Sequence, residues 1–197
     1  MNQQTIVFLG PQGSGKGTQL QLLKEFFEKS DPTRTVLHFE MGATFRGFSG
    51  EEGYSQGLVK ATLAQGQIQP DFLATALFGR TMLEHFKGSE HLLMDGYPRT
   101  RLQAQDFNSA LSFYNLPAPL VLHLNLDEAA ALERLHTRAR EDDTEEALKQ
   151  RLAWYQAQVV PTLDYFRANP LYTVREVNSA QSIEQVHADI VNIITAQ

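Results

Sequence analysis

The chain has 197 residues, of which 42% are hydrophobic, and its formal net charge at pH 7 is −6. This length is enough for one domain with a buried core, and the acidic balance argues against a nucleic-acid partner, which would need a clustered basic surface. The absence of cysteine excludes a disulfide framework and a thiolate zinc site, and the N-terminal residues form no targeting segment, so we expect a cytoplasmic protein.

Five short apolar runs along the chain predict buried strands. They are Thr5–Leu9, Thr35–Phe39, His91–Met94, Leu120–Leu126 and a weaker run at Leu171–Val177. Longer segments between them carry apolar residues at helical spacing, as at Leu20, Leu23 and Phe27. Strands that are apolar throughout and alternate with helices indicate an α/β fold, a parallel five-stranded sheet with helices on both faces. Ligands of such sheets bind beyond the carboxyl ends of the strands.

Two helical inserts interrupt this alternation. Glu51–Phe86 lies between the second and third predicted strands, and Arg138–Ala168 lies between the fourth and fifth. Inserts beside strand ends can form lids over a ligand. No internal repeat or low-complexity linker divides the chain, and no apolar run approaches the roughly 20 residues that cross a bilayer. We therefore expect a single domain spanning residues 1–197, with no membrane partner.

A glycine-rich segment, Gly10–Thr18, follows the first predicted strand and precedes a long helical pattern. Its glycines allow successive amides to converge on phosphate oxygens, the following helix adds its positive end, and Lys16 supplies a cation for the outer phosphates. A simple glycine-rich turn is the alternative, and the strand before and helix after disfavour it. Gly17 stands where a magnesium-binding Ser or Thr usually follows the lysine, and Thr18 comes next.

Other chemistries have little support in the sequence. The six histidines show no metal-ligand spacing, and no serine or histidine lies in a nucleophile motif, so hydrolase chemistry is not indicated. There is also no Asn-Lys-x-Asp motif of the kind that reads guanine, which disfavours a switch GTPase.

Several further motifs occur in the same order as in one family. They are Lys16–Gln19, Asp95–Thr100 with Gln103 after it, the arginines Arg134 and Arg138, the run Arg140–Asp143, and Arg151. In these motifs the chain resembles the adenylate kinase branch of the nucleoside monophosphate kinases, and the resemblance spans nearly the whole chain. It implies a P-loop NTPase-type sheet with a helical insert that binds the nucleoside monophosphate, about residues 40–70, and a very short lid, about residues 135–144.

The resemblance also implies roles for individual residues. The residues implied to be catalytic are Lys16, Arg99, Arg140 and Arg151. Those implied to bind ATP are Gly13, Ser14, Gly15, Lys16, Gly17, Thr18, Arg134 and Arg138, with Arg134 stacking on the adenine. Those implied to bind AMP are Met41, Arg46, Gln69, Gly96, Arg99 and Gln103. Asp95 would hold Mg²⁺ through water. Arginine suits such a site because its planar fork binds phosphate and remains charged.

Each role has a structural alternative. Arg134, Arg138 and Arg151 could form surface ion pairs with nearby acids. Asp95 could cap the helix after its strand, and the acids Asp142–Asp143 could cap a helix that starts at Thr144.

The chain departs from the family pattern mainly in the acceptor region. It reads Glu40–Arg46 as Glu-Met-Gly-Ala-Thr-Phe-Arg, where family members carry Ser-Thr-Gly-Asp before the arginine. Gln69 stands where a valine usually lines the base pocket. Only Ala139 separates Arg138 from Arg140, which leaves no room for a separate lid domain.

The resemblance implies a monomeric, Mg²⁺-dependent enzyme whose partners are ATP and AMP and whose reversible reaction gives two ADP. Gln103 favours AMP as the acceptor. The alternatives are a kinase for UMP, CMP or a deoxynucleotide, and a nucleotide-binding sensor that has lost turnover.

Overall fold

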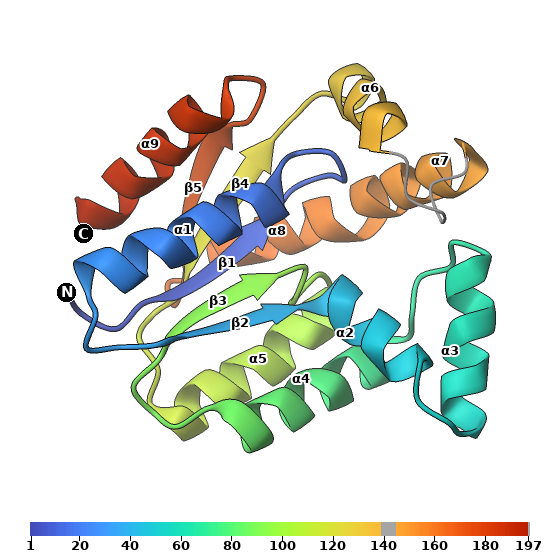
Figure 1. Cartoon of the computed structure of the whole chain (residues 1–197), viewed down its shortest axis with the longest axis horizontal. Coiled ribbons are helices and arrows are strands. Elements are labelled where there is room, and N and C mark those ends of the chain that lie inside the picture. The colour runs from blue at the N-terminus through green and yellow to red at the C-terminus, as the bar shows by residue number, and fades with distance from the viewer. Residues whose placement is uncertain (139–144, 197) are drawn as a thin grey trace.

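Five parallel strands form one sheet in the order β2-β3-β1-β4-β5 (Figure 1). The structure is a computed structural model that describes residues 1–138 and 145–196. The strands are β1 (Thr5–Leu9), β2 (Val36–Glu40), β3 (His91–Asp95), β4 (Leu120–Asn125) and β5 (Thr173–Asn178). All described pairings are parallel, with Phe8 opposite Asp95 and Glu40 opposite the same aspartate. The predicted fold class is confirmed, and each predicted strand lies within two residues of an observed one.

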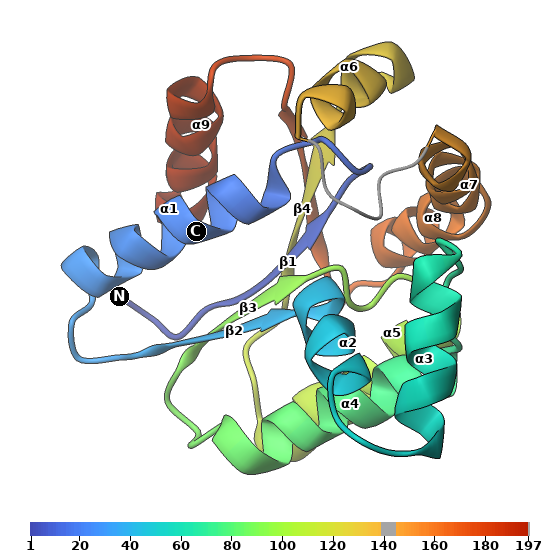
Figure 2. The same cartoon turned by 45° about the vertical axis from the view of Figure 1, so that its right-hand side comes forward.

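Helices connect the strands throughout. Those described are α1 (Lys16–Ser30), α2 (Met41–Ser49), α3 (Tyr54–Ala64), α4 (Asp71–His85), α5 (Arg101–Tyr114), α6 (Glu128–Arg138), α7 (Glu145–Trp154), α8 (Val160–Ala168) and α9 (Ile183–Thr195), with a π-helical turn η1 (Tyr155–Val159) between α7 and α8. In Figure 2, α1 and α9 cover one face of the sheet, and α4, α5 and α8 cover the other.

The three central strands, β3, β1 and β4, are buried on both faces because they are largely apolar, whereas the edge strands β2 and β5 are partly exposed. Along β1, Ile6 and Phe8 pack in one hydrophobic cluster with α1 and α9, whereas Val7 and Leu9 pack in a second cluster with α4, α5 and α8. All four side chains are at most 2% exposed. Successive residues of a strand point to opposite faces, so a continuous apolar run supplies both cores.

Two groups of helices stand beside the carboxyl ends of the strands, at the right in Figure 1. One is α2, α3 and the start of α4, and the other is α6 and α7. The first group begins earlier than the predicted helical insert, because α2 starts at Met41 directly after β2. Glu40 ends the strand in an extended conformation and no glycine or proline separates the two elements.

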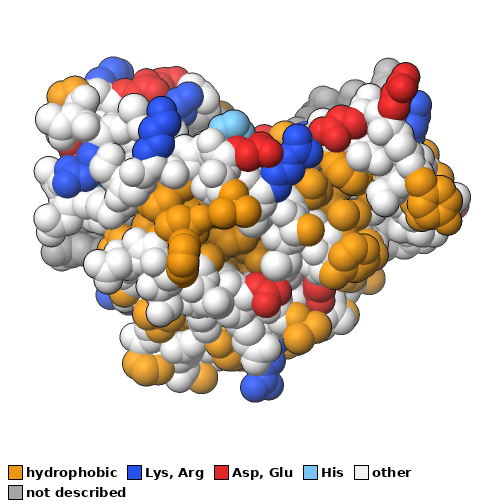
Figure 3. All heavy atoms as spheres, turned by 90° about the horizontal axis from the view of Figure 1, so that it is seen from below, with side chains coloured by type: hydrophobic (Ala, Val, Ile, Leu, Met, Phe, Trp, Pro, Cys, Tyr) orange, Lys and Arg blue, Asp and Glu red, His pale blue; other side chains and the backbone are white. Residues whose placement is uncertain are grey.

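Seen from below, the surface where α4 and α5 lie in Figure 1 carries several exposed apolar side chains (Figure 3). Phe72 and Leu83 of α4 and Leu102 and Phe113 of α5 are all more than half exposed. Among the described residues, no helix is long and apolar enough to cross a membrane.

Candidate active site

A cleft of about 1270 Å³ opens at the carboxyl ends of the strands. Its walls come from the segments after β1, β2 and β3, from α3 and the turn after it, from α6, α7 and η1, and from the turn after β5. Parallel strands bring their carboxyl ends to one edge, so residues far apart in sequence meet there. The cleft therefore lies where the sequence predicted the ligand site.

The glycine-rich segment forms a curled loop at one end of this cleft. Gly13 and Gly15 have φ angles of 83° and 85°, a region that favours glycine, and α1 begins at Lys16 immediately afterwards. A Cβ on Gly13 would lie 2.7 Å from the carbonyl oxygen of Ala131, so α6 packs directly on the loop. Backbone amides at the start of a long helix make this loop suitable for phosphate.

Lys16 folds back over the loop that precedes it. Its Nζ donates to the carbonyl oxygens of Gly10 and Pro11 at 2.9 and 2.8 Å and to Ser14 Oγ at 3.4 Å. These contacts hold the ammonium group above the curled backbone. The remaining residues predicted for the donor phosphates, Gly17 and Thr18, line the same part of the cleft.

Asp95 and Arg99 follow the central strand β3 into the cleft. Asp95 is only 9% exposed, and it does not cap α5, because Thr100 occupies the N-cap position and accepts from the Gln103 backbone amide at 3.2 Å. The capping alternative for Asp95 is therefore wrong. Burial lowers the pKa of Arg99, and Arg151 lowers it further, whereas Asp95 raises it.

The Arg99 guanidinium lies over the bare backbone of Gly96. Gly96 has a φ angle of 73°, and a Cβ added there would come within 2.7 Å of Arg99 Cζ. A side chain at this position would displace the guanidinium, so the glycine determines where the arginine lies.

Gln103 makes two hydrogen bonds with its side-chain amide. Oε1 accepts from the Arg99 backbone amide at 2.8 Å, and Nε2 donates to Asp71 Oδ1 at 2.7 Å. The side chain is 5% exposed and lines the cleft. The amide joins α5 to the first residue of α4 and keeps one N–H and one oxygen lone pair beyond these two hydrogen bonds.

The other residues predicted for the acceptor lie on α2 and on the turn after α3. Met41 is buried at the start of α2, and Arg46 pairs with Glu40 across 3.2 Å. Gln69 is 9% exposed and exchanges hydrogen bonds with Thr62 at 3.0 to 3.1 Å. All three predicted residues line the cleft.

Two of the arginines predicted after β4 also reach the cleft. Arg134 of α6 donates to the Gly13 carbonyl at 3.5 Å, and Arg151 of α7 lines the wall beside Trp154. Arg140, the acids Asp142–Asp143 and the side chain of Arg138 lie outside the described residues, as does most of the predicted lid, residues 135–144.

The described lining of the cleft is strongly cationic. Two of its charged side chains are negative, Glu40 and Asp95. The positive ones are Lys16, Arg46, Lys60, Arg99, Arg134 and Arg151. This excess of positive charge is local, because the chain as a whole carries a net charge of −6. It favours an anionic ligand with several phosphates. Within the part of the chain that the structure describes, no three histidine or acidic side chains gather as a metal cage.

A polar chain under the cleft was not predicted. His123 of β4 contacts Tyr155 Oη through Nε2 at 2.5 Å and Glu176 Oε2 through Nδ1 at 2.6 Å. Glu176 also pairs with Arg167 at 2.6 Å. Burial lowers the pKa of His123 and raises that of Tyr155 to about 12. No local sequence signal joins these residues, since the His123 and Tyr155 side chains meet only through the fold.

The turn after β5 also lines the cleft, and this was not predicted. Ser179, Gln181 and Ser182 line the cleft beside the phosphate-binding loop, and Gln19 of α1 donates to the Ile183 carbonyl at 2.9 Å. The one signal available was its position after a parallel strand.

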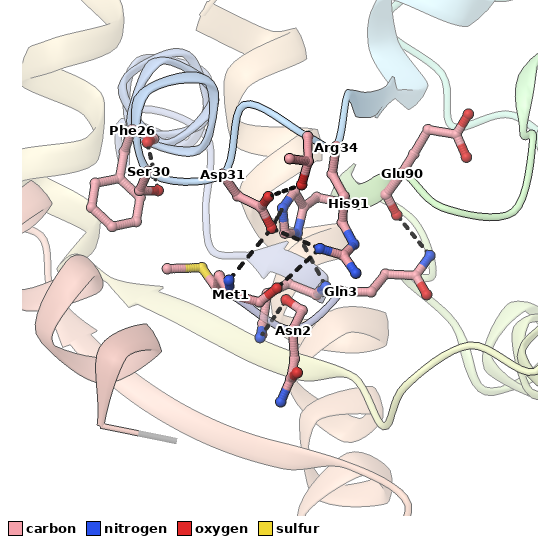
Figure 4. Close-up of polar contacts among 11 residues, drawn as sticks. Met1, Asn2, Gln3, Phe26, Ser30, Asp31, Arg34, Glu90 and His91 are labelled. Carbon is pink, nitrogen blue, oxygen red and sulfur yellow. Dashed lines mark hydrogen bonds and ion pairs between the residues drawn. The ribbon is translucent and has the colours of Figure 1, made fainter.

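A polar cluster at the opposite end of the strands has a structural role (Figure 4). The buried Asp31 carboxylate accepts from Thr33 at 2.6 Å and Arg34 at 2.9 Å and lies 3.4 Å from His91 Nε2. The Thr33 hydrogen bond, with Arg34 adding to it, lowers the pKa of Asp31 to about 2 although burial opposes this. His91 begins β3 whereas Asp95 ends it, so the cluster joins strand starts and lies away from the cleft.

Comparison with known proteins agrees with this site. The adenylate kinase family model matches residues 8–170. A relative named adenylate kinase from Rhodopirellula baltica is 32% identical over 189 residues, covering 94% of this chain and 92% of that protein. An adenylate kinase from Prochlorococcus marinus (strain AS9601) is 31% identical and covers 94% of this chain and 95% of that protein. One from Mycobacterium sp. (strain MCS) is 32% identical, covering 93% and 94%.

Proposed function

We propose that this chain, which belongs to the adenylate kinase family and is a nucleoside monophosphate kinase, transfers the γ-phosphoryl group of ATP to AMP reversibly, giving two ADP, with Mg²⁺ as cofactor. The observation that carries the proposal is one continuous cleft with a phosphate-binding loop at one end and Arg46, Arg99 and Gln103 at the other. A donor and an acceptor can therefore meet within it.

Phosphoryl transfer needs positioning and charge more than covalent help from the protein. In our proposal Lys16 leaves its loop carbonyls for the outer phosphates of ATP, the amides of Gly13–Thr18 bind the phosphate oxygens, and Arg134 and Arg138 hold the adenosine side of the donor. Arg99, Arg140 and Arg151 neutralise the transferring group. Burial chiefly lowers the pKa of Arg99, and repulsion from Arg151 adds to this; a bound phosphate would offset both effects, which supports the role proposed for Arg99.

On the acceptor side, Arg46 and Arg99 would hold the monophosphate, with Met41, Gln69 and Gly96 around it. Gln103 would read adenine, because its amide offers one donor and one acceptor to a base edge. Its hydrogen bonds to Asp71 and to the Arg99 backbone amide support this, since they already orient the buried side chain.

Mg²⁺ would neutralise charge on the donor phosphates when bound. The available donors suit it, because Asp95 and Thr18 both line the cleft and offer hard oxygen ligands. Asp95 is the residue that we propose to hold the ion through water.

We also infer one domain over residues 1–197, with an acceptor-binding insert of about residues 40–70 and a short lid of about residues 135–144 that excludes water on closure. A monomeric state and a cytoplasmic location stay predictions from composition and resemblance.

The test is purified protein with Mg²⁺ and ATP, offered AMP, GMP, CMP, UMP and dAMP in turn while diphosphate formation is followed. Preference for AMP is expected, with Lys16→Ala inactive. Lys24→Ala is the matched control, because Lys24 lies on the same helix, is 42% exposed and pairs only loosely with Glu28 at 3.9 Å. Preference for another monophosphate would refute AMP specificity, and binding of ATP without any turnover would point to a sensor.

A further inference from the structure

In the acceptor half of the cleft, the acidic side chain of Glu40 is paired with Arg46, an arginine predicted to bind the acceptor. Glu40 Oε1 lies 3.2 Å from Arg46 Nη2, and both side chains line the cleft. Their side chains are 36% and 50% exposed, so a ligand can reach either of them. Arg46 is thus already engaged by a carboxylate in the unliganded protein.

The local backbone brings this pair together. Glu40 is the last residue of β2 and precedes α2 directly, so its side chain projects at the helix start, and Arg46 reaches back along the helix. Between them is Gly42, where an added Cβ would lie 3.2 Å from Arg46 Nη1 and 3.8 Å from Glu40 Oε1. The pair therefore occupies the space above a glycine that has no side chain.

The charge of Glu40 matters because of what surrounds it. Glu40 is opposite Asp95 in the parallel register, so the only two described carboxylates of the cleft end neighbouring strands. A phosphate that approaches Arg46 must replace the Glu40 carboxylate or share the guanidinium with it. Either arrangement costs binding free energy, because two anions repel each other beside one cation.

We propose that Glu40 sets acceptor affinity: it holds Arg46 while the site is empty, releases it when a monophosphate binds, and so weakens the binding of every nucleoside monophosphate whatever its base. The inference rests on the proposed function, because it takes Arg46 as a ligand of the acceptor phosphate. Glu40 acts through Arg46 and is a positioning residue. A purely structural pair at the start of α2 would alter stability and leave acceptor affinity alone.

The test is calorimetric titration of AMP, GMP, CMP and UMP into the wild type and Glu40→Gln, which keeps the shape and removes the charge. The dissociation constants are expected to fall by about 1.5- to fivefold, the equivalent of an exposed ion pair. The factor should be the same for all four bases, should shrink at high salt, and should be absent for ATP. Glu51→Gln is the matched control, since Glu51 pairs with Arg80 at 3.4 Å, is 46% exposed, and lies outside the cleft lining. It should change none of these values.

A double-mutant cycle completes the test. With Arg46→Gln in the background, Glu40→Gln should no longer improve affinity, because the cation for which the two anions compete is gone. Unchanged or weaker binding in Glu40→Gln, a gain confined to one base, a gain that persists without Arg46, or no binding of any monophosphate by either protein would each overturn the inference. Turnover separates the two proposals, because a uniform gain in affinity in a protein without kinase activity would uphold the inference and refute the proposed function.

Discussion

Replacing Tyr155 by phenylalanine tests the polar chain under the cleft. The Glu176 carboxylate can only accept a hydrogen bond, so the contact of 2.6 Å assigns the ring proton of His123 to Nδ1. Nε2 then accepts from the Tyr155 hydroxyl at 2.5 Å. Burial raises the pKa of Tyr155 to about 12, so the hydroxyl keeps its proton at assay pH. The substitution removes this donor and nothing else.

The cost follows from burial. Tyr155 and His123 are each 8% exposed, so Nε2 would lose its hydrogen bond where water has little access. Leaving a buried acceptor without a donor costs about 1–3 kcal/mol. For a chain of this size, each kcal/mol lowers the melting temperature by about 2–4 °C. We expect Tyr155→Phe to melt about 2–12 °C below the wild type.

Urea unfolding followed by far-ultraviolet circular dichroism measures the change in the free energy of unfolding. The fluorescence of the single tryptophan, Trp154, reports on the surroundings of the adjacent Tyr155. Tyr114→Phe is the control, because the Tyr114 hydroxyl has no hydrogen-bond partner among the described residues, although its ring packs against Phe86. If the two variants differ by less than about 0.5 kcal/mol, the assigned hydrogen bond contributes nothing and the reasoning is refuted.

Three further predictions concern the loop, the acceptor arginine and pH. Gly13→Ala should weaken ATP binding at least tenfold, by titration, because its Cβ would lie 2.7 Å from the Ala131 carbonyl and push α6 off the loop. Gly96→Ala should lower kcat/KM for the acceptor about 10- to 100-fold, in steady-state kinetics, because it displaces the Arg99 guanidinium. Burial lowers the pKa of His123 in the folded state below 6.5. As the pH falls below about 6.5, the His123 side chain therefore binds a proton more readily in the unfolded chain, and the free energy of unfolding decreases. His123→Gln should reduce that pH dependence of unfolding, without abolishing it, because other histidines shift in the same direction.

Each of these has a matched control and a contradictory result. Gly15→Ala has the same positive φ as Gly13 and no atom within 4 Å of the new Cβ, so equal losses of ATP binding would disprove the steric argument. Gly88→Ala is the control for Gly96→Ala, because Gly88 also has a positive φ angle, 103°, has no atom within 4 Å of an added Cβ, and lies outside the cleft lining. His85→Gln, at an exposed position, should leave the pH dependence intact, and an effect equal to that of His123→Gln would contradict the burial argument.

Much of the fold was predictable because its determinants are local in sequence. Continuous apolar runs such as Thr5–Leu9 can only be satisfied by burial on both faces, so they indicated the parallel sheet before any contact was known. The phosphate-binding loop was equally local, since its glycine conformations and the helix start after it lie within nine residues, Gly10–Thr18. Arg46, Arg99 and Gln103 were found by resemblance, and the sheet brings all three to one cleft.

The sequence by itself determined the strands, the phosphate-binding loop and the types of side chain that follow the strand ends. Only the tertiary structure decided which side chains pair there. Asp71 and Gln103 are 32 residues apart, and His123 and Glu176 are 53 apart, yet each pair lies within hydrogen-bond distance. Glu40 and Arg46 are close in sequence, and their pairing still depended on α2 beginning directly after β2. Such contacts depend on how elements dock, and a sequence pattern specifies which face an element buries without specifying the partner that it meets.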